Sequence, residues 1–293
     1  NFIFSSELKV LNFLKTEENI NTNSLNLYFN YLSIPSPFSI YKNFNKLSPG
    51  SFITLKINEL EKKKITEKKY YNKKEIIINN KNKKITGQQQ SDELENLLTN
   101  SIEDMLISDK PVGAFLSGGI DSSLICSLLS KRLNKKIKTF TIGFENKNYD
   151  ESIFAKNISN FLNTDHYEHI FNEDDVKSII PEIPIVYDEP FSDSSQIPTY
   201  LVSKIAKETV SVSLTGDGGD ELFGGYNRYI LSNKYWPILN LTPFFLREII
   251  GKLLGNQLIK KYSEKLNKIG VKLRNIKSIE DLYFNYTTEL NMI

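Results

Sequence analysis

Between residues 91 and 214, short apolar segments that suit β-strands alternate with longer segments that suit amphipathic helices. The predicted strands are residues 112–116, 137–144, 166–171 and 210–214. The predicted helices are one that begins at Ser91, residues 121–133 and 150–162, and one that Pro198 opens. Strands separated by helices of this length form a parallel sheet through right-handed crossovers. Because such sheets bind ligands beyond the carboxyl ends of their strands, we expect a site after Leu116, Phe144 and Leu214.

The segments around this region differ in composition. Residues 1–72 are predicted to contain strands and hairpins, because Ile53, Leu55 and Ile57 alternate after a turn at residues 48–50 and residues 2–4 are apolar. Residues 73–90 are predicted to be a linker rich in Lys and Asn around a strand-like run at residues 76–78. Residues 91–293 form the second predicted domain, which becomes helical after Tyr226.

Two predicted helices carry apolar faces. The helix from Ser91 is expected to be capped by Asp92 and Glu95, and its apolar side chains are Leu94, Leu97, Leu98, Met105 and Leu106. The apolar face of the helix at residues 121–133 is formed by Leu124, Ile125, Leu128 and Leu129. Cys126 lies beside that face, so we expect it to be a small core residue.

The overall charge argues against nucleic-acid and membrane partners. Lys and Arg number 37 against 35 Asp and Glu, a formal net charge of +2. The lysine-rich segment at residues 62–84 has only Tyr70 and Tyr71 as aromatics, so a solvated linker is favoured over a nucleic-acid surface. No apolar run approaches the roughly 18 residues of a membrane span. We therefore expect a soluble, cytoplasmic protein, and homodimerisation stays open.

Cysteine and histidine are scarce. The single cysteine excludes a disulfide within the chain, and with only His166 and His169 a zinc cage of Cys and His cannot be built. The two histidines are expected to pack at a strand end or lie on the surface rather than to shuttle protons.

The turn after the first predicted strand has the features of an anion site. It reads Ser117-Gly118-Gly119-Ile120-Asp121-Ser122-Ser123. Two glycines let the main chain approach a phosphate at the start of a helix, and the serines add hydroxyl donors. The Asp121 carboxylate would repel a phosphate unless a cation lies between them, so we expect Mg²⁺. The alternative is an ordinary capped turn before a core helix.

The turn after the last predicted strand, residues 215–226, contains five glycines and the carboxylates of Asp217, Asp220 and Glu221. Its spacing fits neither the dinucleotide fingerprint nor the calcium loop. Carboxylates on a flexible turn at a strand end suit a second contact to a metal and a phosphate. A solvated turn is the alternative.

Together the two turns resemble the paired signatures of the glutamine-dependent asparagine synthetases. The resemblance extends to residues 139–144, 149–151, 164–166 and 188–195. Residues 4–9 and 46–50 resemble the closing part of that family's glutaminase domain. The resemblance implies a Rossmann-like α/β fold of the PP-loop class, similar to adenine nucleotide alpha hydrolases, after a β-rich remnant of an Ntn-type glutaminase domain.

The resemblance also implies site residues. The β and γ phosphates of ATP, with Mg²⁺, would be held by Ser117, Gly118, Gly119, Asp121 and Ser122, and Ser123 adds a hydroxyl. Asp220 would be a second metal or pyrophosphate contact. The adenosine and α-phosphate would be lined by Leu116, Ile142, Thr215 and Gly216. Asp217 stands where related enzymes place a glutamate linked to the reactive carboxyl, and residues 192–195 match a region near the amino-acid substrate.

The implied reaction adenylates aspartate with ATP, releases pyrophosphate, and forms asparagine and AMP when glutamine-derived ammonia displaces AMP. Two features depart from the family. Its glutaminase uses an N-terminal cysteine, whereas this sequence begins with Asn1 and has no cysteine before Cys126. The family's downstream lysine is expected after Ile293. We therefore expect these residues to be the middle of a longer protein, and inactive alone.

Three other functions stay open. Relatives of the family amidate or cyclise other carboxylates, as β-lactam synthetases do. A non-catalytic nucleotide-binding module would explain the missing cysteine and lysine. An RNA-binding or tRNA-thiolating protein is less favoured, because thiolating relatives usually need additional cysteines.

Overall fold

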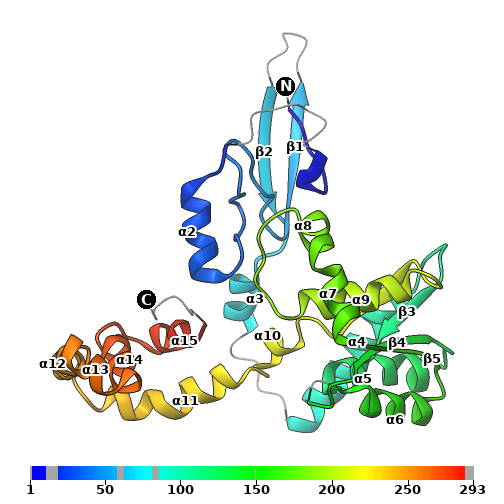
Figure 1. The fold of residues 1–293 in the computed structure, drawn as a ribbon. Helices are drawn as coiled ribbons and strands as arrows, with labels where there is room; N and C mark the ends of the chain where they lie inside the picture. The colour runs from blue at the N-terminus through cyan, green and yellow to red at the C-terminus, as the bar shows by residue number, and fades with distance from the viewer. Residues whose placement is uncertain (1, 11–18, 58–62, 81–85, 149, 288–293) are drawn as a thin grey trace. The chain divides into compact units, whose positions relative to one another are not determined.

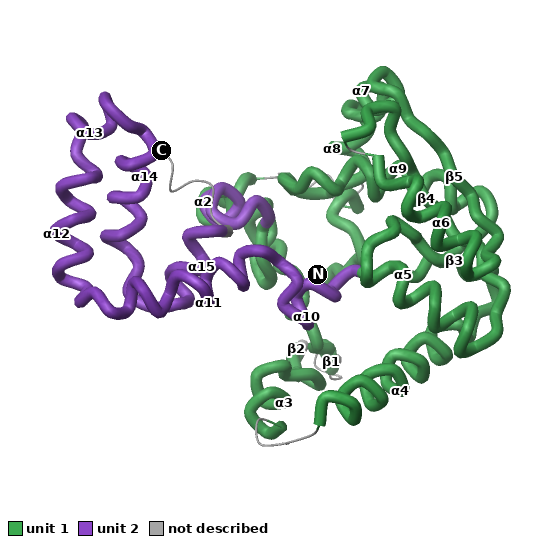
Figure 2. Tube along the Cα trace, turned by 90° about the horizontal axis from the view of Figure 1, so that it is seen from below, with its two compact units in different colours: residues 1–25, 34–216 green, residues 26–33, 217–293 purple. Residues whose placement is uncertain are grey.

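The computed structural model describes residues 2–10, 19–57, 63–80, 86–148 and 150–287. Asn1, Tyr149 and Ile293, which the sequence predictions name or include, lie outside these ranges, as do the two ends of the lysine-rich segment at residues 62–84. The chain forms two compact units (Figure 2). The first comprises residues 1–25 and 34–216, and the second comprises residues 26–33 and 217–293. The predicted domain limits at residues 72 and 91 fall inside the first unit and stay predictions.

The first unit contains a four-stranded sheet (Figure 1). Its strands are β3 (Val112–Phe115), β4 (Lys138–Phe144), β5 (Asp165–Phe171) and β6 (Val212–Leu214). They lie in the order β5-β4-β3-β6, and every neighbouring pair is parallel. The predicted parallel α/β sheet is confirmed. Its carboxyl ends share one edge, which brings the turns after β3 and β6 to the same side of the sheet.

Helices cover both faces of this sheet (Figure 1). Those that follow the strands are α5 (Ile120–Ser127), which continues as a π-helical turn Leu128–Arg132, α6 (Ser152–Leu162), α7 (Glu173–Ile179), α8 (Ile183–Val186) and α9 (Gln196–Ala206). Because successive strand residues point to opposite faces of a sheet, the side chains of β3 pack into two hydrophobic cores, one on each face. Ala114 packs with residues of α5 and α6, whereas Phe115 packs with Phe140 of β4 and Val202 of α9.

Helix α4 (Gly87–Met105) differs from its prediction. It begins four residues before Ser91, because Thr86 and Gln89 form the capping box that was expected from Asp92 and Glu95. Its buried side is set by Thr99 and Ile102, while Leu97 and Met105 are 61% and 57% exposed. In α5, Leu124 is likewise 39% exposed, whereas Leu128 and Leu129 are buried as predicted.

The part of the first unit before α4 also corrects two expectations. The expected strand at Ile53, Leu55 and Ile57 is present as β1 (Ser51–Ile57), and it pairs in antiparallel register with β2 (Lys63–Lys69). The strand-like run at residues 76–78 is instead helical, within α3 (Lys73–Asn80). A run of three apolar residues does not distinguish strand from helix, and the side chain of Asn72 bonds Glu75 in the first turn. Residues 2–4 form no strand, but a 3₁₀ turn follows at Leu8–Val10.

The second unit is helical, as predicted for the chain after Tyr226. Its helices are α10 (Gly219–Phe223), α11 (Asn227–Asn240), α12 (Phe244–Leu254), α13 (Gln257–Tyr262), α14 (Glu264–Leu273) and α15 (Ile279–Thr287), and α2 (Thr22–Tyr31) enters it from residue 26. Arg247 is 5% exposed, and its guanidinium donates to the carbonyls of Thr242 and Ile276. Among the described helices, none has the length and apolar character needed to cross a membrane.

Cys126 is a core residue, as predicted, with no exposed surface. Burial raises the pKa of its thiol to about 12. Because the thiolate is the reactive form, we expect an aromatic disulfide reagent at pH 8 to leave Cys126 unlabelled in the folded protein and to label it after unfolding in guanidinium. Peptide mass spectrometry locates the label. Labelling of Cys126 at the rate of a free thiol in the folded protein would contradict this packing.

Candidate functional site

The turn after β3 leads into the N-terminus of α5. Gly118 has a φ of +86°, a left-handed conformation that glycine adopts readily. Gly119 is extended and precedes the helix, and no described side chain caps this end. The first N–H groups of α5 therefore have no acceptor within the helix, and the positive end of the helix dipole lies beside them. This arrangement favours binding of an anion.

The three serine hydroxyls of this turn have different positions. Ser122 is 8% exposed, and its Oγ lies 3.2 Å from the Ser117 N–H that it accepts and 3.2 Å from the Gly119 carbonyl. Ser123 also donates to the Gly119 carbonyl, at 2.6 Å. Ser117 is exposed, and its Oγ accepts the Gly119 N–H at 3.3 Å. Ser122 and Ser123 thus hold the shape of the turn, and the Oγ of the exposed Ser117 also lies 3.0 Å from the Ser122 Oγ, in a hydrogen bond that either hydroxyl can donate.

Two glycines bring other segments against the turn. A Cβ added to Gly216 would lie 2.8 Å from both Asp121 Cβ and the Ser122 nitrogen. A Cβ added to Gly118 would lie 2.7 Å from Phe154 Cβ on α6. Both distances are shorter than real Cβ contacts, so each glycine allows a close backbone approach. The structure therefore brings Gly216, at the end of β6, directly against the first turn of α5.

The other residues predicted to line the nucleotide lie in or directly after strands of the sheet: Leu116 follows β3, Ile142 lies in β4, and Thr215 follows β6. The Leu116 side chain is 1% exposed and belongs to the core, so only its main chain faces the turn. Its N–H donates to the Phe140 carbonyl at 3.0 Å, and its carbonyl accepts the Thr141 hydroxyl. Ile142 is half-buried and packs against the core under α9. Thr141 was not predicted as a site residue, because the strand offers the same local signal, a hydroxyl, at Thr139 as well.

The second turn enters the second unit at Asp217, and its acids are described within that unit. Gly218 has a φ of +90° and precedes the short helix α10. A Cβ added to Gly225 would lie 2.0 Å from Asp220 Oδ1, so the Asp220 carboxylate rests on the Gly225 backbone. The Tyr226 hydroxyl donates to Glu221 at 2.5 Å, and this bond raises the pKa of Tyr226 to about 12. The Glu221 carboxylate thus accepts a hydrogen bond from Tyr226, while the Asp217 side chain is exposed.

His166 packs within the sheet at the start of β5. Its Nδ1 lies 3.0 Å from the hydroxyl of Thr139, which is fully buried. Its Nε2 is also buried and has no hydrogen-bond partner among the described residues. Burial lowers the pKa of His166 below the usual 6.5, although the charge of Glu168 opposes the shift. His166 is therefore a neutral packing residue, and His169 is exposed.

This pKa shift predicts an acid-sensitive stability. Because the folded pKa is below that of the unfolded chain, the unfolded state binds the proton more readily. The neutral His166 therefore contributes fully to the free energy of unfolding above pH 6.5. This contribution declines as the pH falls from 6.5 toward the folded pKa. We expect His166→Gln to weaken the pH dependence of the free energy of unfolding between pH 7 and 5. The matched His169→Gln variant should show the same pH dependence of the free energy of unfolding as the unaltered protein. An imidazole pKa above 6.5 for His166 by NMR titration would contradict this.

The donor set of the first turn suits a metal bound together with phosphates. Among the described residues, no cluster of three or more His, Cys, Asp or Glu side chains could hold a metal ion. Mg²⁺ typically binds through one or two carboxylates together with substrate phosphates and water. Asp121, half-exposed in the first turn of α5, fits such a role, whereas a cage made of protein ligands alone would not.

Comparison with known proteins gives matches over both ends of the chain. A family model described as asparagine synthase matches residues 93–289, and one described as a glutamine amidotransferase domain matches residues 1–71. The putative asparagine synthetase [glutamine-hydrolyzing] 2 of Methanocaldococcus jannaschii is 40% identical over 256 residues, which cover 86% of this chain and 48% of that protein. The asparagine synthetase [glutamine-hydrolyzing] 1 of Bacillus subtilis is 33% identical over 226 residues, covering 77% and 34%.

The chain thus spans about half the length, or less, of these relatives. Among solved structures, the NH3-dependent NAD synthetase of Campylobacter jejuni aligns with 49% of this chain and 62% of that chain. Its sequence identity is 17% and its TM-score is 0.32, which is too low to support a comparison of folds.

Proposed function

Because the chain belongs to the asparagine synthase family, we propose that it carries the ATP-binding part of an enzyme that makes asparagine from aspartate, ATP and glutamine-derived ammonia. One observation supports this most: the glycine turn at the N-terminus of α5 lies directly against Gly216 after β6. The match of residues 1–71 to a glutamine amidotransferase domain supports glutamine as the source of ammonia.

The proposed nucleotide site assigns a role to each predicted residue. The β and γ phosphates bind the N–H groups of the first turn and the Ser117 hydroxyl, in the shape that Ser122 and Ser123 maintain. The adenosine and α-phosphate lie beside Ile142, Thr215, Gly216 and the main chain of Leu116. Asp121 and Asp220 are the proposed carboxylate ligands of Mg²⁺, which supplies charge neutralisation to the phosphates when it is bound.

The chemistry follows from these roles. The side-chain carboxylate of aspartate attacks the α-phosphorus of ATP, and the bond from that phosphorus to the oxygen bridging to the β-phosphorus breaks, so that pyrophosphate leaves. Ammonia then attacks the acyl carbon, and AMP leaves with the bonding electrons. Because two anions must meet, catalysis consists mainly of alignment and charge neutralisation by fixed N–H groups. We propose that Asp217 orients the reacting carboxyl, as the glutamate of related enzymes does, with a shorter side chain.

Product analysis tests this function. The protein expressed from its complete reading frame is supplied with Mg²⁺, ATP, aspartate and either glutamine or ammonium. We expect asparagine, AMP and pyrophosphate in equal amounts. ADP and phosphate would contradict the assigned phosphate positions, because they arise from cleavage between the β and γ phosphates. Product only from another carboxylate would favour a substrate such as that of a β-lactam synthetase.

The proposed partners are small molecules, and a cytoplasmic location is part of the same proposal. Aspartate, ATP and glutamine are all soluble metabolites. No interaction with nucleic acid or membranes is proposed, and a homodimer stays open.

A further inference from the structure

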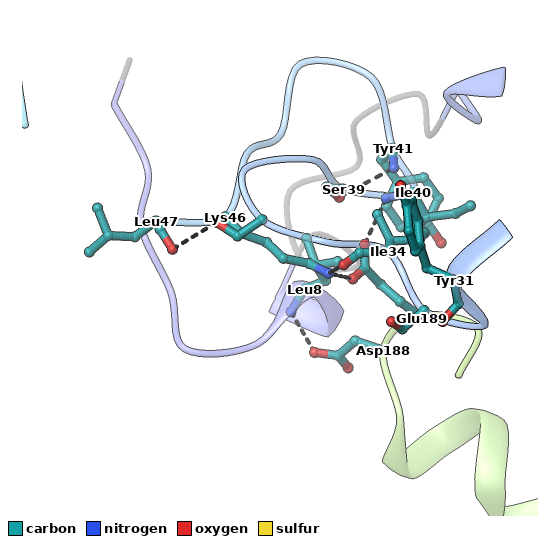
Figure 3. A network of polar contacts seen from close by, with 12 residues as sticks. Leu8, Tyr31, Ile34, Ser39, Ile40, Tyr41, Lys46, Leu47, Asp188 and Glu189 are labelled. Carbon is teal, nitrogen blue, oxygen red and sulfur yellow. Dashed lines mark hydrogen bonds and ion pairs between the residues drawn. The ribbon is translucent and has the colours of Figure 1, made fainter. Parts of the chain in front are cut away.

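Two adjacent acidic residues connect the N-terminal part of the first unit with the loop that precedes α9 (Figure 3). Asp188 and Glu189 lie in this loop, residues 187–195, and their side chains are only 18% and 12% exposed. Carboxylates buried to this extent need charged or hydrogen-bonded partners. Their partners lie far away in sequence, within residues 2–57.

Glu189 is held by two groups within residues 34–46 (Figure 3). Its carboxylate forms an ion pair with the Lys46 ammonium. Its Oε1 accepts the Ile40 N–H at 2.6 Å. The same Lys46 ammonium donates to the Ile34 carbonyl at 2.7 Å, so the ammonium itself is fixed. Charge-assisted bonds of this kind are stronger than neutral ones.

Asp188 contacts a second N-terminal segment. Its Oδ2 accepts the Leu8 N–H at 2.6 Å, and its Oδ1 lies 3.6 Å from the Lys9 ammonium. That ammonium also donates to the Ile185 carbonyl, at 3.4 Å. Leu8 and Ile40 thus each give a backbone N–H to one of two consecutive carboxylates. The specific feature is the pairing of two backbone donors with two adjacent acids.

Hydrogen bonds connect this loop to the start of α9. The Tyr187 hydroxyl donates to the Gln196 carbonyl at 3.2 Å. Asp193 accepts both the N–H and the hydroxyl of Ser195, at 2.8 and 2.6 Å, which fixes the residue before the helix. These bonds lower the pKa of Asp193. α9 in turn packs on β4, the strand that carries Ile142.

We infer that Asp188 and Glu189 are positioning residues. Through them, residues 1–71, which match the amidotransferase family, set the conformation of the 187–195 loop and the start of α9. The catalytic consequence rests on the proposed function. The pair matters most when nitrogen comes from glutamine, because that reaction needs the two family segments to act together. It matters less when ammonia is supplied from solution.

Hydrogen exchange tests the contact between the 187–195 loop and the N-terminal residues without any assay of activity. Glu189→Ala should speed exchange of the Ile40 amide by about tenfold, and Glu189→Gln should restore much of the protection, because its amide oxygen still accepts the bond. Lys46→Met should also speed exchange of the Ser195 amide, although Lys46 does not touch it. Glu208→Ala, at an exposed acid after α9, is the matched control. Changes confined to residues 34–46 in Lys46→Met would overturn the inference.

The nitrogen source tests the catalytic part in the protein expressed from its complete reading frame. Lys46→Met should lower glutamine-dependent asparagine formation by about tenfold and leave ammonium-dependent formation within about twofold. Lys46→Arg should restore the glutamine reaction, and Lys42→Met, at an exposed lysine, should change neither. Equal losses with both nitrogen sources would overturn the inference. If the unaltered protein makes no asparagine from ammonium, the proposed function fails instead. The hydrogen-exchange experiment then still tests whether the N-terminal contacts position the 187–195 loop.

Discussion

The Gly216→Ala variant is expected to lose about 100-fold in the rate of aspartate-dependent exchange of pyrophosphate into ATP, because a small displacement of a reacting group costs a rate of this order. The added Cβ would lie 2.8 Å from the Ser122 nitrogen and from Asp121 Cβ, and 2.9 Å from the Asp121 carbonyl carbon. Backbone atoms at these distances must move. The first turn of α5 would therefore shift away from β6 and misplace the N–H groups proposed to hold the phosphates.

The matched control for this variant is Gly87→Ala, whose added Cβ would meet no atom within 4 Å. Gly87 is the first residue of α4, where alanine is tolerated, so this variant should keep the full exchange rate. Circular dichroism of both variants separates a local shift from unfolding. Full activity of a folded Gly216→Ala protein would show that the contact between the end of β6 and α5 plays no part in the reaction.

The second large effect is expected from Asp121→Asn. The substitution keeps the shape of the side chain but removes the charge proposed to bind Mg²⁺ beside the phosphates. We expect the exchange rate to fall by about 100-fold, in the range found when one preorganised electrostatic group is removed from an active site. The Mg²⁺ concentration that gives half of the maximal rate should rise as well. Both quantities come from one titration of exchange rate against Mg²⁺.

Two further variants complete this test. Asp121→Glu retains the charge and should be less impaired than Asp121→Asn. Asp109→Asn removes a charge from an exposed turn before β3 and should not alter the Mg²⁺ requirement. If Asp121→Asn keeps its rate and its Mg²⁺ requirement, the carboxylate merely favours the helix N-terminus, as acids in a first helical turn commonly do.

The sheet and the position of its turns were predictable from sequence, because local pattern determines both. Residues such as Ala114 and Phe140 lie in short apolar runs buried on both faces, and glycines mark the turn after β3. Errors arose where two local signals competed. Thr86 and Gln89 form a capping box six residues before the one expected, and the three isoleucines at residues 76–78 are too short a run to distinguish strand from helix.

The parts that sequence could not give are contacts between distant segments. Nothing local in Gly216 indicates that its backbone touches Asp121, about a hundred residues away. The same is true of Glu189, which was noted only as part of a motif and whose partners Ile40 and Lys46 lie in another family segment. The burial of Leu116 and the internal bonds of Ser122 likewise depend on packing, so their supporting role was visible only in the structure.

The most direct test of the central claim is the exchange of labelled pyrophosphate into ATP by the protein expressed from its complete reading frame, without any nitrogen donor. Exchange requires that the enzyme form an acyl-adenylate reversibly from a carboxylate and ATP. We expect exchange that depends on aspartate and Mg²⁺, is absent without aspartate, and is lost in Gly216→Ala. Exchange that is equally fast without aspartate, or the absence of exchange at saturating aspartate and ATP, would contradict the account.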